Sequence, residues 1–586
     1  MSNQTRLAAL RDLMQTCELD AWLVPRSDEH QGEYVAPYAE RLRWSTGFDG
    51  SAGMAIIMSQ KAAIFVDGRY TLQARKQVDL DLFEVVHTAD ISVGQWMAKH
   101  TSGMMVGFDP WLHTESEIDR YKQACAGLGV QFVAMEGNLI DDVWHDQPEM
   151  PLDPILIYED LFAGESRAAK CMRLGMELMA RKIDAAVITS LDSIAWLLNI
   201  RGRDIPCTPV ALAYAILYAN GKVDLFTHPD KLKEKLGSDV RLYPYKNFME
   251  APVDLKNRRV LYDPKTSPIQ VRVNLDTVGA QVVTGDDICL MAKACKNSVE
   301  LEGMRKSHVR DGAALTEFLS WATDRLQKGA LSELQASDAL RGFREKKDHF
   351  QGLSFETIAG SGPNGAIIHY RVTPESDRLL RTDELFLLDS GAQYLDGTTD
   401  VTRTVAFSKP TPEQKDRFTR VLKGHIAIAT AVFPIGTTGG QLDVLARKSL
   451  WSVGLDYQHG TGHGVGSYLC VHEGPQRIAK GLVTDVALRP GMILSNEPGY
   501  YKEGEYGIRI ESLIIVRPHS EGFLRFETIT MAPICLDLVD VDLLTDEEKE
   551  WLNAYHREVW EKLMPMLDPS HSPHVQTWLE KQTVAV

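Results

Sequence analysis

An internal repeat in the first half of the chain constrains the fold more than any other feature. Residues 6–28, RLAALRDLMQTCELDAWLVPRSD, align without gaps with residues 170–192, KCMRLGMELMARKIDAAVITSLD, and the two share apolar positions and aspartates. Each copy has apolar residues at helical spacing, then a short turn at an aspartate, then an apolar strand. Both copies are followed by an aromatic-containing segment that leads into a glycine turn. The repeat predicts two copies of one α/β domain.

The remainder of the chain has a different organisation. Asn297 is a predicted helix N-cap with Glu300 three positions on, and apolar residues follow at helical spacing. From residue 384 onward, strand-like runs such as ELFLLDSG, TRTVAF and ESLIIV alternate with helical segments, which favours an antiparallel α+β arrangement. Proline and acidic residues in HDQPEMPLDP (145–154) interrupt the repeat. We therefore predict domains at 1–150, 151–295 and 296–586.

The last of these domains ends in a C-terminal extension (541–586). Thr545 and Glu548 form a predicted capping box for the helix that follows, DEEKEWLNAYHREVWEKLMPML. This helix has an aromatic face, which we expect to pack against the last domain or against a second subunit.

Composition excludes several classes of partner. At 586 residues the chain is too long for a single core, and its net charge of −17 argues against nucleic acid as a partner. The longest apolar run, Val210–Ala219, is about half of a membrane span, so we expect no membrane association. The N-terminus has no apolar core of signal-peptide length, and the eight cysteines are scattered without a C-x-x-C pair. This pattern is typical of reduced thiols and predicts a cytoplasmic protein.

Residues 459–475, HGTGHGVGSYLCVHEGP, place three histidines among five glycines. A helical zinc site would use His-Glu-x-x-His with helix-forming residues between the ligands. Each glycine in a helix costs about 1 kcal/mol relative to alanine, so a helix is unfavourable here. Glycine does allow other groups to approach the main chain closely. The stretch therefore predicts a loop that presents part of a site whose partners lie elsewhere.

Four acidic residues lie inside or beside apolar strand-like runs, where carboxylates are costly unless they are paired or metal-bound. They are Asp389, Asp400, Glu497 and Glu511. Any one of them alone could cap a turn or pair with arginine, but four together with a glycine-flanked histidine favour a shared site. An oxygen-rich site with one imidazole suits two hard divalent cations, Mn²⁺ above all, with Zn²⁺ or Co²⁺ as alternatives.

The hairpin that carries the first two acids raises a problem of register. A two-residue turn at Asp396-Gly397 would leave Asp389 and Asp400 four residues out of register, about 13 Å apart, which is too far for a shared site. A bulge near Gly391 or a longer loop would restore the match. We predict a loop centred close to Tyr394.

Four stretches of this sequence together resemble a known family. LLDSGAQYLDGTTDVTRT, HGTGHGVGSYLCVHEGP, ILSNEPGYYKEGEYGIRIES and GSGPNGAIIHY resemble aminopeptidase P, the Xaa-Pro aminopeptidases of the pita-bread metallopeptidases. STGFDGSAG and FVDGRY resemble the family's first domain and WLLNIRG its second, so the chain resembles the long, three-domain cytosolic form. The resemblance implies two related creatinase-type α/β domains followed by a pita-bread α+β catalytic domain, and we expect a homodimer.

The resemblance also implies a role for each site residue. Asp389 would bind one ion, His463 and Glu497 the other, and Asp400 and Glu511 would bridge both. His369, His459 and His472 resemble the family's substrate-side histidines, and Tyr501 and Arg509 its supporting residues. Glu497 would take the proton of a metal-bridging water, which becomes the attacking hydroxide, and pass it to the leaving nitrogen. His472 would stabilise the oxyanion, and His369 would help to place the peptide.

The function implied is removal of an N-terminal residue when proline follows it. The nearest alternative is prolidase, which shares the ligands but takes only dipeptides; the long N-terminal repeat favours aminopeptidase P. Methionine aminopeptidase would leave the first half of the chain without a purpose, and creatinase-like enzymes lack the metal ligands. A non-catalytic pita-bread peptide- or histone-binding module typically loses ligands, whereas all five are present here.

Overall fold

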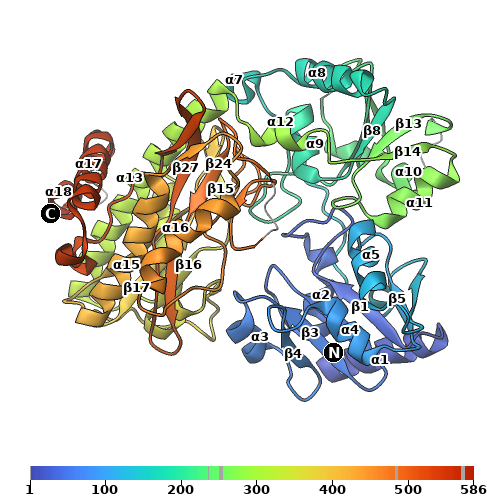
Figure 1. Ribbon diagram of the computed structural model, residues 1–586, viewed down its shortest axis with the longest axis horizontal. Coiled ribbons are helices and arrows are strands. Elements are labelled where there is room, and N and C mark those ends of the chain that lie inside the picture. The colour runs from blue at the N-terminus through green and yellow to red at the C-terminus, as the bar shows by residue number, and fades with distance from the viewer. Residues whose placement is uncertain (1, 235, 250–254, 482–485, 569, 571–573) are drawn as a thin grey trace. The chain divides into compact units, whose positions relative to one another are not determined.

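The computed structural model describes residues 2–234, 236–249, 255–481, 486–568, 570 and 574–586 (Figure 1). The chain divides into two compact units. The first comprises Met1–Asp160 with Glu165–Leu290, and the second comprises Leu161–Gly164 with Met291–Val586. Within the described ranges, none of the helices combines the length and the apolar character needed to cross a membrane.

The first unit contains two six-stranded sheets with the same topology. One has the order β4-β3-β2-β1-β5-β6 and the other β12-β11-β10-β8-β13-β14. In both, the third strand in spatial order pairs antiparallel with its two neighbours, and the fourth pairs parallel with the fifth. The strands are β1 (Ala21–Pro25), β2 (Met54–Met58), β3 (Ala62–Val66), β4 (Glu84–His87), β5 (Met105–Phe108), β6 (Gln131–Ala134), β8 (Ala185–Ile188), β10 (Tyr214–Tyr218), β11 (Val223–Phe226), β12 (Val240–Tyr243), β13 (Arg259–Tyr262) and β14 (Gln281–Thr284).

Helices accompany each of these sheets. The aligned copies begin with α1 and α8, each of which leads through a turn into a central strand, as the repeat predicts. Every residue of β1 and of β8 is buried, as expected for strands covered on both faces. The helices are α1 (Asn3–Thr16), α2 (Arg41–Thr46), α3 (Thr71–Gln77), α4 (Val93–His100), α5 (Glu115–Ala124), α6 (Leu139–Val143), α8 (Arg167–Ala180), α9 (Leu191–Leu198), α10 (Tyr245–Met249) and α11 (Ile269–Thr277). This unit also contains a short pair of strands, β7 (Leu156–Ile157) and β9 (Ile200–Arg201). Two short helices, α7 (Asp160–Ala163) and α12 (Leu290–Ala294), lie mostly in the second unit.

The second unit is an antiparallel α+β domain. Its larger sheets have the orders β16-β17-β20, β15-β18-β19 and β21-β28-β27-β24. Two ribbons, β22-β23 and β25-β26, complete it. The strands are β15 (Phe350–Leu353), β16 (Ile358–Ser361), β17 (Leu385–Ser390), β18 (Ala392–Tyr394), β19 (Gly397–Thr398), β20 (Val401–Ala406), β21 (Val432–Pro434), β22 (Gly462–His463), β23 (Arg477–Ile478), β24 (Ile493–Asn496), β25 (Gly499–Lys502), β26 (Tyr506–Arg509), β27 (Ser512–Ser520) and β28 (Phe523–Thr528).

Helices of the second unit pack around these strands (Figure 1). They are α13 (Ser298–Lys328), α14 (Glu333–Arg344), α15 (Pro412–Ala429), α16 (Gly439–Trp451), α17 (Asp546–Leu563) and α18 (Val575–Gln582). The capping boxes predicted at Asn297–Glu300 and Thr545–Glu548 are both present. Leu552, Tyr555 and Val559 of α17 belong to one buried core with residues of α13 and β17, so the aromatic face of α17 packs against its own domain.

The register of the first site hairpin differs from our prediction. Asp389 pairs with Thr402 and Tyr394 with Gly397, so the chain turns at Leu395 and Asp396 rather than at a loop centred on Tyr394. Asp389 and Asp400 are then diagonal neighbours on one face of the hairpin, and such pairs lie about 7–8 Å apart between Cα atoms. This separation is compatible with a shared site, so neither a longer loop nor a bulge at Gly391 is required.

The reason for this register lies in the packing of α13 against the turn. A Cβ atom on Gly397 would lie 2.4 Å from the Ser307 Oγ atom, and a Cβ atom on Gly303 would lie 2.3 Å from the carbonyl oxygen of Asp396. The side chain of Arg310 also pairs with Asp396. Gly397 is therefore required in the strand, where α13 approaches closely, and not in the turn.

Candidate metal centre and substrate site

The predicted ligands come from the ends of strands in the second unit. Asp389 is the penultimate residue of β17, and Asp400 directly precedes β20. His463 ends the short strand β22, and Glu497 directly follows β24. Glu511 lies between β26 and β27. The antiparallel pairing of these strands brings five residues that span more than 120 positions of sequence into one region.

The side chains converge closely. Asp400, His463 and Glu511 each offer one ligand atom, and the three atoms lie within 4.8 Å of one another. The Nε2 atom of His463 lies 3.5 Å from Asp400 Oδ2 and 3.4 Å from Glu497 Oε1. These contacts place one imidazole between two carboxylates, as expected for a metal site built from one histidine and several acids.

The electrostatics of the cluster are unfavourable without a cation. Burial, together with the charges of Asp400 and Glu497, raises the pKa of Glu511 well above its usual value. Burial raises the pKa of Asp389 to about 6, although Arg509 opposes the rise. Carboxylates this close repel one another, so a divalent cation would remove an existing electrostatic cost.

Two further observations show that these residues fit a metal. The Oδ1 atom of Asp389 is buried and has no hydrogen-bond partner among the described residues, which leaves it available to a cation. The Nδ1 atom of His463 lies 3.0 Å from the carbonyl oxygen of Gly464 and donates to it. That hydrogen bond fixes the tautomer in which Nε2 presents a lone pair to the carboxylates.

His463 gains a proton where no cation competes for it. Burial lowers the pKa of His463, but the hydrogen bond to Asp400 and the charges of Glu497 and Asp400 outweigh burial and raise it to about 9. A proton and a divalent cation are alternative ways to neutralise the same cluster.

A chain of hydrogen bonds connects the predicted substrate side to the ligands. The Tyr501 hydroxyl lies 2.9 Å from His459 Nε2 and accepts from Arg509 Nη1 at 2.7 Å. Arg509 Nη2 donates to Asp389 Oδ2 at 2.5 Å. His459 Nδ1 lies 2.7 Å from the carbonyl oxygen of Gly460. Tyr501 and Arg509 therefore orient both a histidine at the edge of the cluster and a predicted ligand.

The other two predicted substrate histidines are half-buried. The ring of His472 packs edge-on against that of His463, with centroids 4.2 Å apart. His369 lies three residues beyond the 3₁₀ turn Gly362–Ala366, which contacts β17 and β26. His472 therefore lies close to the cluster. The substrate roles of both histidines stay predictions.

Sequence reasoning missed several residues that support the ligands. Thr402 Oγ1 donates to Glu511 Oε2 at 2.7 Å. Ser495 Oγ donates to Glu497 Oε1 at 3.1 Å and accepts from the His463 amide at 2.9 Å. Arg447, buried on α16, donates to the carbonyl oxygen of His459 at 2.8 Å. Thr402 and Ser495 each stand two residues from a ligand on the same strand face, a spacing that could have identified them.

The glycines of 459–475 have a packing role. A Cβ atom on Gly462 would lie 1.9 Å from the carbonyl oxygen of Ser495, and one on Gly464 would lie 2.0 Å from that of Glu473. Neither residue has a positive φ angle, so close backbone approach, rather than an unusual conformation, requires glycine here.

Comparisons with known proteins agree with this geometry. Residues 302–518 match metallopeptidase family M24, and 522–586 match the C-terminal region of that peptidase family. Residues 6–143 and 146–300 match two descriptions of the creatinase/prolidase N-terminal domain. The fold and the carboxylate–histidine cluster thus define a metallopeptidase with two creatinase-type N-terminal domains and a pita-bread catalytic domain.

Relatives that align over nearly the whole chain show which family of metallopeptidases it belongs to. The chain is 42% identical to a probable Xaa-Pro aminopeptidase P of Laccaria bicolor, over 96% of this chain and 90% of the relative. It is 43% identical to a probable Xaa-Pro aminopeptidase P of Neosartorya fischeri, over 99% and 92%. The crystal structure of an X-prolyl aminopeptidase from Caenorhabditis elegans, described as a cytosolic enzyme with a di-nuclear active site, superposes with a TM-score of 0.94 at 35% identity and covers all of both chains. The chain belongs to the aminopeptidase P family of Xaa-Pro aminopeptidases.

Proposed function

We propose that this enzyme hydrolyses the bond between the N-terminal residue of a peptide and a proline in the second position, with the help of two divalent cations. The observation that carries the proposal is the cluster of four carboxylates and one histidine. Within the described residues a buried Asp389 oxygen lacks a hydrogen-bond partner, and the pKa of Glu511 is raised well above its usual value. Such a cluster is stable only when positive charge neutralises it.

Five residues would hold the two ions. Asp389 would bind one, His463 and Glu497 would bind the other, and Asp400 and Glu511 would serve both. The oxygen-rich donor set favours Mn²⁺, with Zn²⁺ or Co²⁺ as alternatives. When bound, the ions polarise the scissile carbonyl and lower the pKa of water to near neutrality.

Glu497 moves the proton. The Xaa-Pro bond is a tertiary amide without an N–H group. Its nitrogen, like that of any amide, must gain a proton to leave as an amine. Glu497 accepts the proton of the attacking water and passes it to the proline nitrogen. Its Oε1 atom accepts from the Ser495 hydroxyl at 3.1 Å, which holds the carboxylate at the edge of the cluster.

The histidines and the acidic pocket bind the substrate. His472 donates to the oxyanion that forms on the scissile carbonyl, and His369 and His459 place the peptide. Tyr501 and Arg509 keep His459 in orientation through the hydrogen bonds described above. The negative charge of the pocket attracts the free α-ammonium group of the substrate.

Cleavage of longer peptides is favoured over a prolidase activity limited to dipeptides. A dipeptidase needs a cationic group for the carboxylate of its substrate, and 459–475 contains neither arginine nor lysine. For the whole protein we further propose domains at 1–150, 151–295 and 296–586, a homodimer, and a cytoplasmic location.

Metal removal and restoration test the function. The enzyme dialysed against a chelator is expected to lose hydrolysis of Arg-Pro-Pro and to regain it when two equivalents of Mn²⁺ are added, with elemental analysis as the second readout. An enzyme that binds no divalent metal, or that cleaves Arg-Pro-Pro equally well without it, would contradict the proposal.

A further inference from the structure

The C-terminal extension has no part in the mechanism above. One of its side chains, Tyr555, nevertheless contacts Arg403, which in turn contacts a predicted bridging ligand. Arg403 of β20 is 1% exposed. Its Nη1 atom donates to the carbonyl oxygen of Glu511 at 2.5 Å, and its Nη2 atom donates to the hydroxyl of Tyr555 on α17 at 2.8 Å. One guanidinium therefore connects a predicted metal ligand to the C-terminal helix.

The same guanidinium fixes the backbone next to both predicted bridging ligands. Arg403 Nη1 also donates to the carbonyl oxygen of Thr402 at 2.9 Å, and that oxygen accepts from the amide of Glu511 at 3.1 Å. Glu511 is thus held at its amide, at its carbonyl and, through the Thr402 hydroxyl, at its carboxylate. Asp400 lies three residues before Arg403 and directly precedes the same strand.

Every hydrogen bond that the described part of the chain gives Arg403 ends on a carbonyl or hydroxyl oxygen. The other acceptors are the carbonyl oxygens of Ala532 and Pro533 and the hydroxyl of Ser512. A buried guanidinium without a carboxylate partner depends on such acceptors to offset its desolvation. The Tyr555 hydroxyl supplies one of them, and its single proton is within reach of the carbonyl oxygens of Thr530 and Ala532, each 2.9 Å from the hydroxyl oxygen.

A second path from α17 reaches the other end of the site. The ring of Trp551 stacks on that of Tyr555 at 5.3 Å and meets the ring of His425 edge-on at 6.0 Å. His425 Nδ1 lies 3.0 Å from the carbonyl oxygen of Asn496. The side-chain amide of Asn496 donates to the carbonyl oxygen of His425 at 2.9 Å. Asn496 directly precedes Glu497.

We infer that α17 is a positioning element of the metal centre, and that Tyr555 is a positioning residue that acts on Glu511 through Arg403. The inference deepens the proposed function and rests on its ligand set. A bridging ligand must be held to within about 0.5 Å, and partners of ligands typically contribute about 10- to 100-fold to metal affinity or activity. The helix would therefore contribute to catalysis although it supplies no ligand.

Tyr555→Phe is the informative variant, because it removes one hydroxyl and keeps the ring that packs in the core. We expect the metal-free variant to bind Mn²⁺ about tenfold more weakly in equilibrium dialysis. We expect kcat on Arg-Pro-Pro to fall about tenfold while KM changes less than twofold. Arg403→Lys keeps the charge but cannot reach all of the acceptors, so its losses should be larger.

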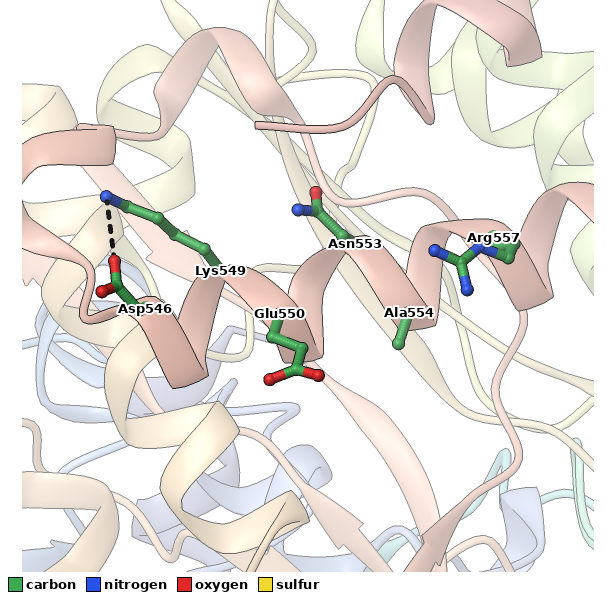
Figure 2. A pocket seen from close by; sticks show the side chains of 6 residues that line it. All are labelled: Asp546, Lys549, Glu550, Asn553, Ala554 and Arg557. Atoms are coloured by element: carbon green, nitrogen blue, oxygen red, sulfur yellow. Dashed lines mark ion pairs between the residues drawn. The ribbon is translucent and has the colours of Figure 1, made fainter.

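Matched controls separate positioning from loss of stability. Tyr121→Phe removes a buried hydroxyl that donates to Glu117 at 2.7 Å in the first unit. Arg557→Lys changes an exposed side chain of α17, on the face with a surface hollow of about 370 Å³ (Figure 2). Both controls should keep wild-type Mn²⁺ affinity and kcat.

Two results would overturn the inference. Tyr555→Phe could lower the melting temperature and leave Mn²⁺ affinity and kcat unchanged, which would make α17 a purely structural element. It could instead raise KM alone, which would place the effect in the peptide cleft. Asp400→Asn distinguishes these results from failure of the proposed function: if that variant also keeps its metal, the ligand set is wrong, and if it loses metal, only the inference on α17 fails.

Discussion

Asp389 and Glu511 are carboxyl groups placed where their charged forms are disfavoured. Their pKa values are raised mainly by burial and further by the neighbouring acids. Arg509 donates to Asp389 and Thr402 donates to Glu511, and one Asp389 oxygen has no hydrogen-bond partner in the described part of the chain. At this scale the site is an incomplete set of charges that two divalent cations would complete.

The bridging acids give the first prediction. Asp400→Asn and Glu511→Gln should each lower metal content and reduce kcat on the order of 10³-fold, because a neutral amide bridges two cations poorly. Elemental analysis and the rate on Arg-Pro-Pro provide the measurements. Glu550→Gln, an exposed change on α17, should alter neither. Two metals per chain and normal turnover in either bridging variant would refute the ligand assignment.

The three histidines of 459–475 should have different roles, one in metal binding and two in catalysis. His463→Ala is expected to lose metal, because its Nε2 atom faces Asp400 and Glu497. His459→Ala and His472→Ala should keep their metal and lose mainly kcat. Metal content measured beside kcat decides the matter, and equal metal loss in all three variants would indicate a site with several histidine ligands.

At the scale of single elements, the loop that carries His463 depends on close backbone contacts. Gly462→Ala should destabilise the protein by about 1–3 kcal/mol, since its Cβ atom would overlap the carbonyl oxygen of Ser495. Gly342→Ala on α14 has open space and should stabilise by up to about 1 kcal/mol. Urea denaturation compares the two, and equal effects would show that Gly462 is not needed for packing.

The docking of α17 should depend on pH. Burial and the charge of Arg403 lower the pKa values of His425 and His556 to about 3. Their pKa in the unfolded chain is about 6.5, so the unfolded chain binds more protons below that pH. Their contribution to stability is complete above pH 6.5 and is lost as the pH falls toward 3, by about 2 kcal/mol for each histidine at pH 5.

His556→Gln isolates one of these groups. In the wild type, His556 Nε2 accepts a hydrogen bond from the Ile534 amide at 3.0 Å. Glutamine can accept the same hydrogen bond through its side-chain oxygen, but it cannot be protonated. The free energy of unfolding of this variant, measured in urea with a chelator present, should therefore fall less steeply between pH 7 and pH 5 than that of the wild type. Parallel slopes would contradict the account.

For the molecule as a whole, local patterns in the sequence predicted the fold classes well. The repeated helix–turn–strand pattern predicted two related α/β domains because each copy buries its own apolar face. Acids beside apolar strands predicted the cluster because such positions are costly without cations. The hairpin loop was predicted close to Tyr394 because Asp389 and Asp400 were expected to lie opposite each other. The chain instead turns at Leu395 and Asp396, where α13 packs against Gly397, a long-range contact that the local sequence does not contain.

Residues that act through others were also invisible in the sequence. Arg403 and Tyr555 are separated by 152 positions, and only the folded chain shows that they meet. Arg447 reaches the carbonyl oxygen of His459 in the same way, from a helix that carries no ligand. Resemblance to a family predicts the ligands, whereas the residues that support those predicted ligands are seen only in the structure.

The central claim is that this enzyme removes one residue from the free N-terminus of peptides with proline in the second position. The most direct measurement compares kcat/KM for Xaa-Pro, Xaa-Pro-Pro and acetyl-Xaa-Pro-Pro with the same first residue. We predict efficient cleavage of Xaa-Pro-Pro, poorer cleavage of Xaa-Pro, whose carboxylate finds no cationic partner, and resistance of the acetylated peptide, which lacks the ammonium group. Preference for the dipeptide would assign the chain to prolidase activity, and indifference to acetylation would contradict the aminopeptidase account.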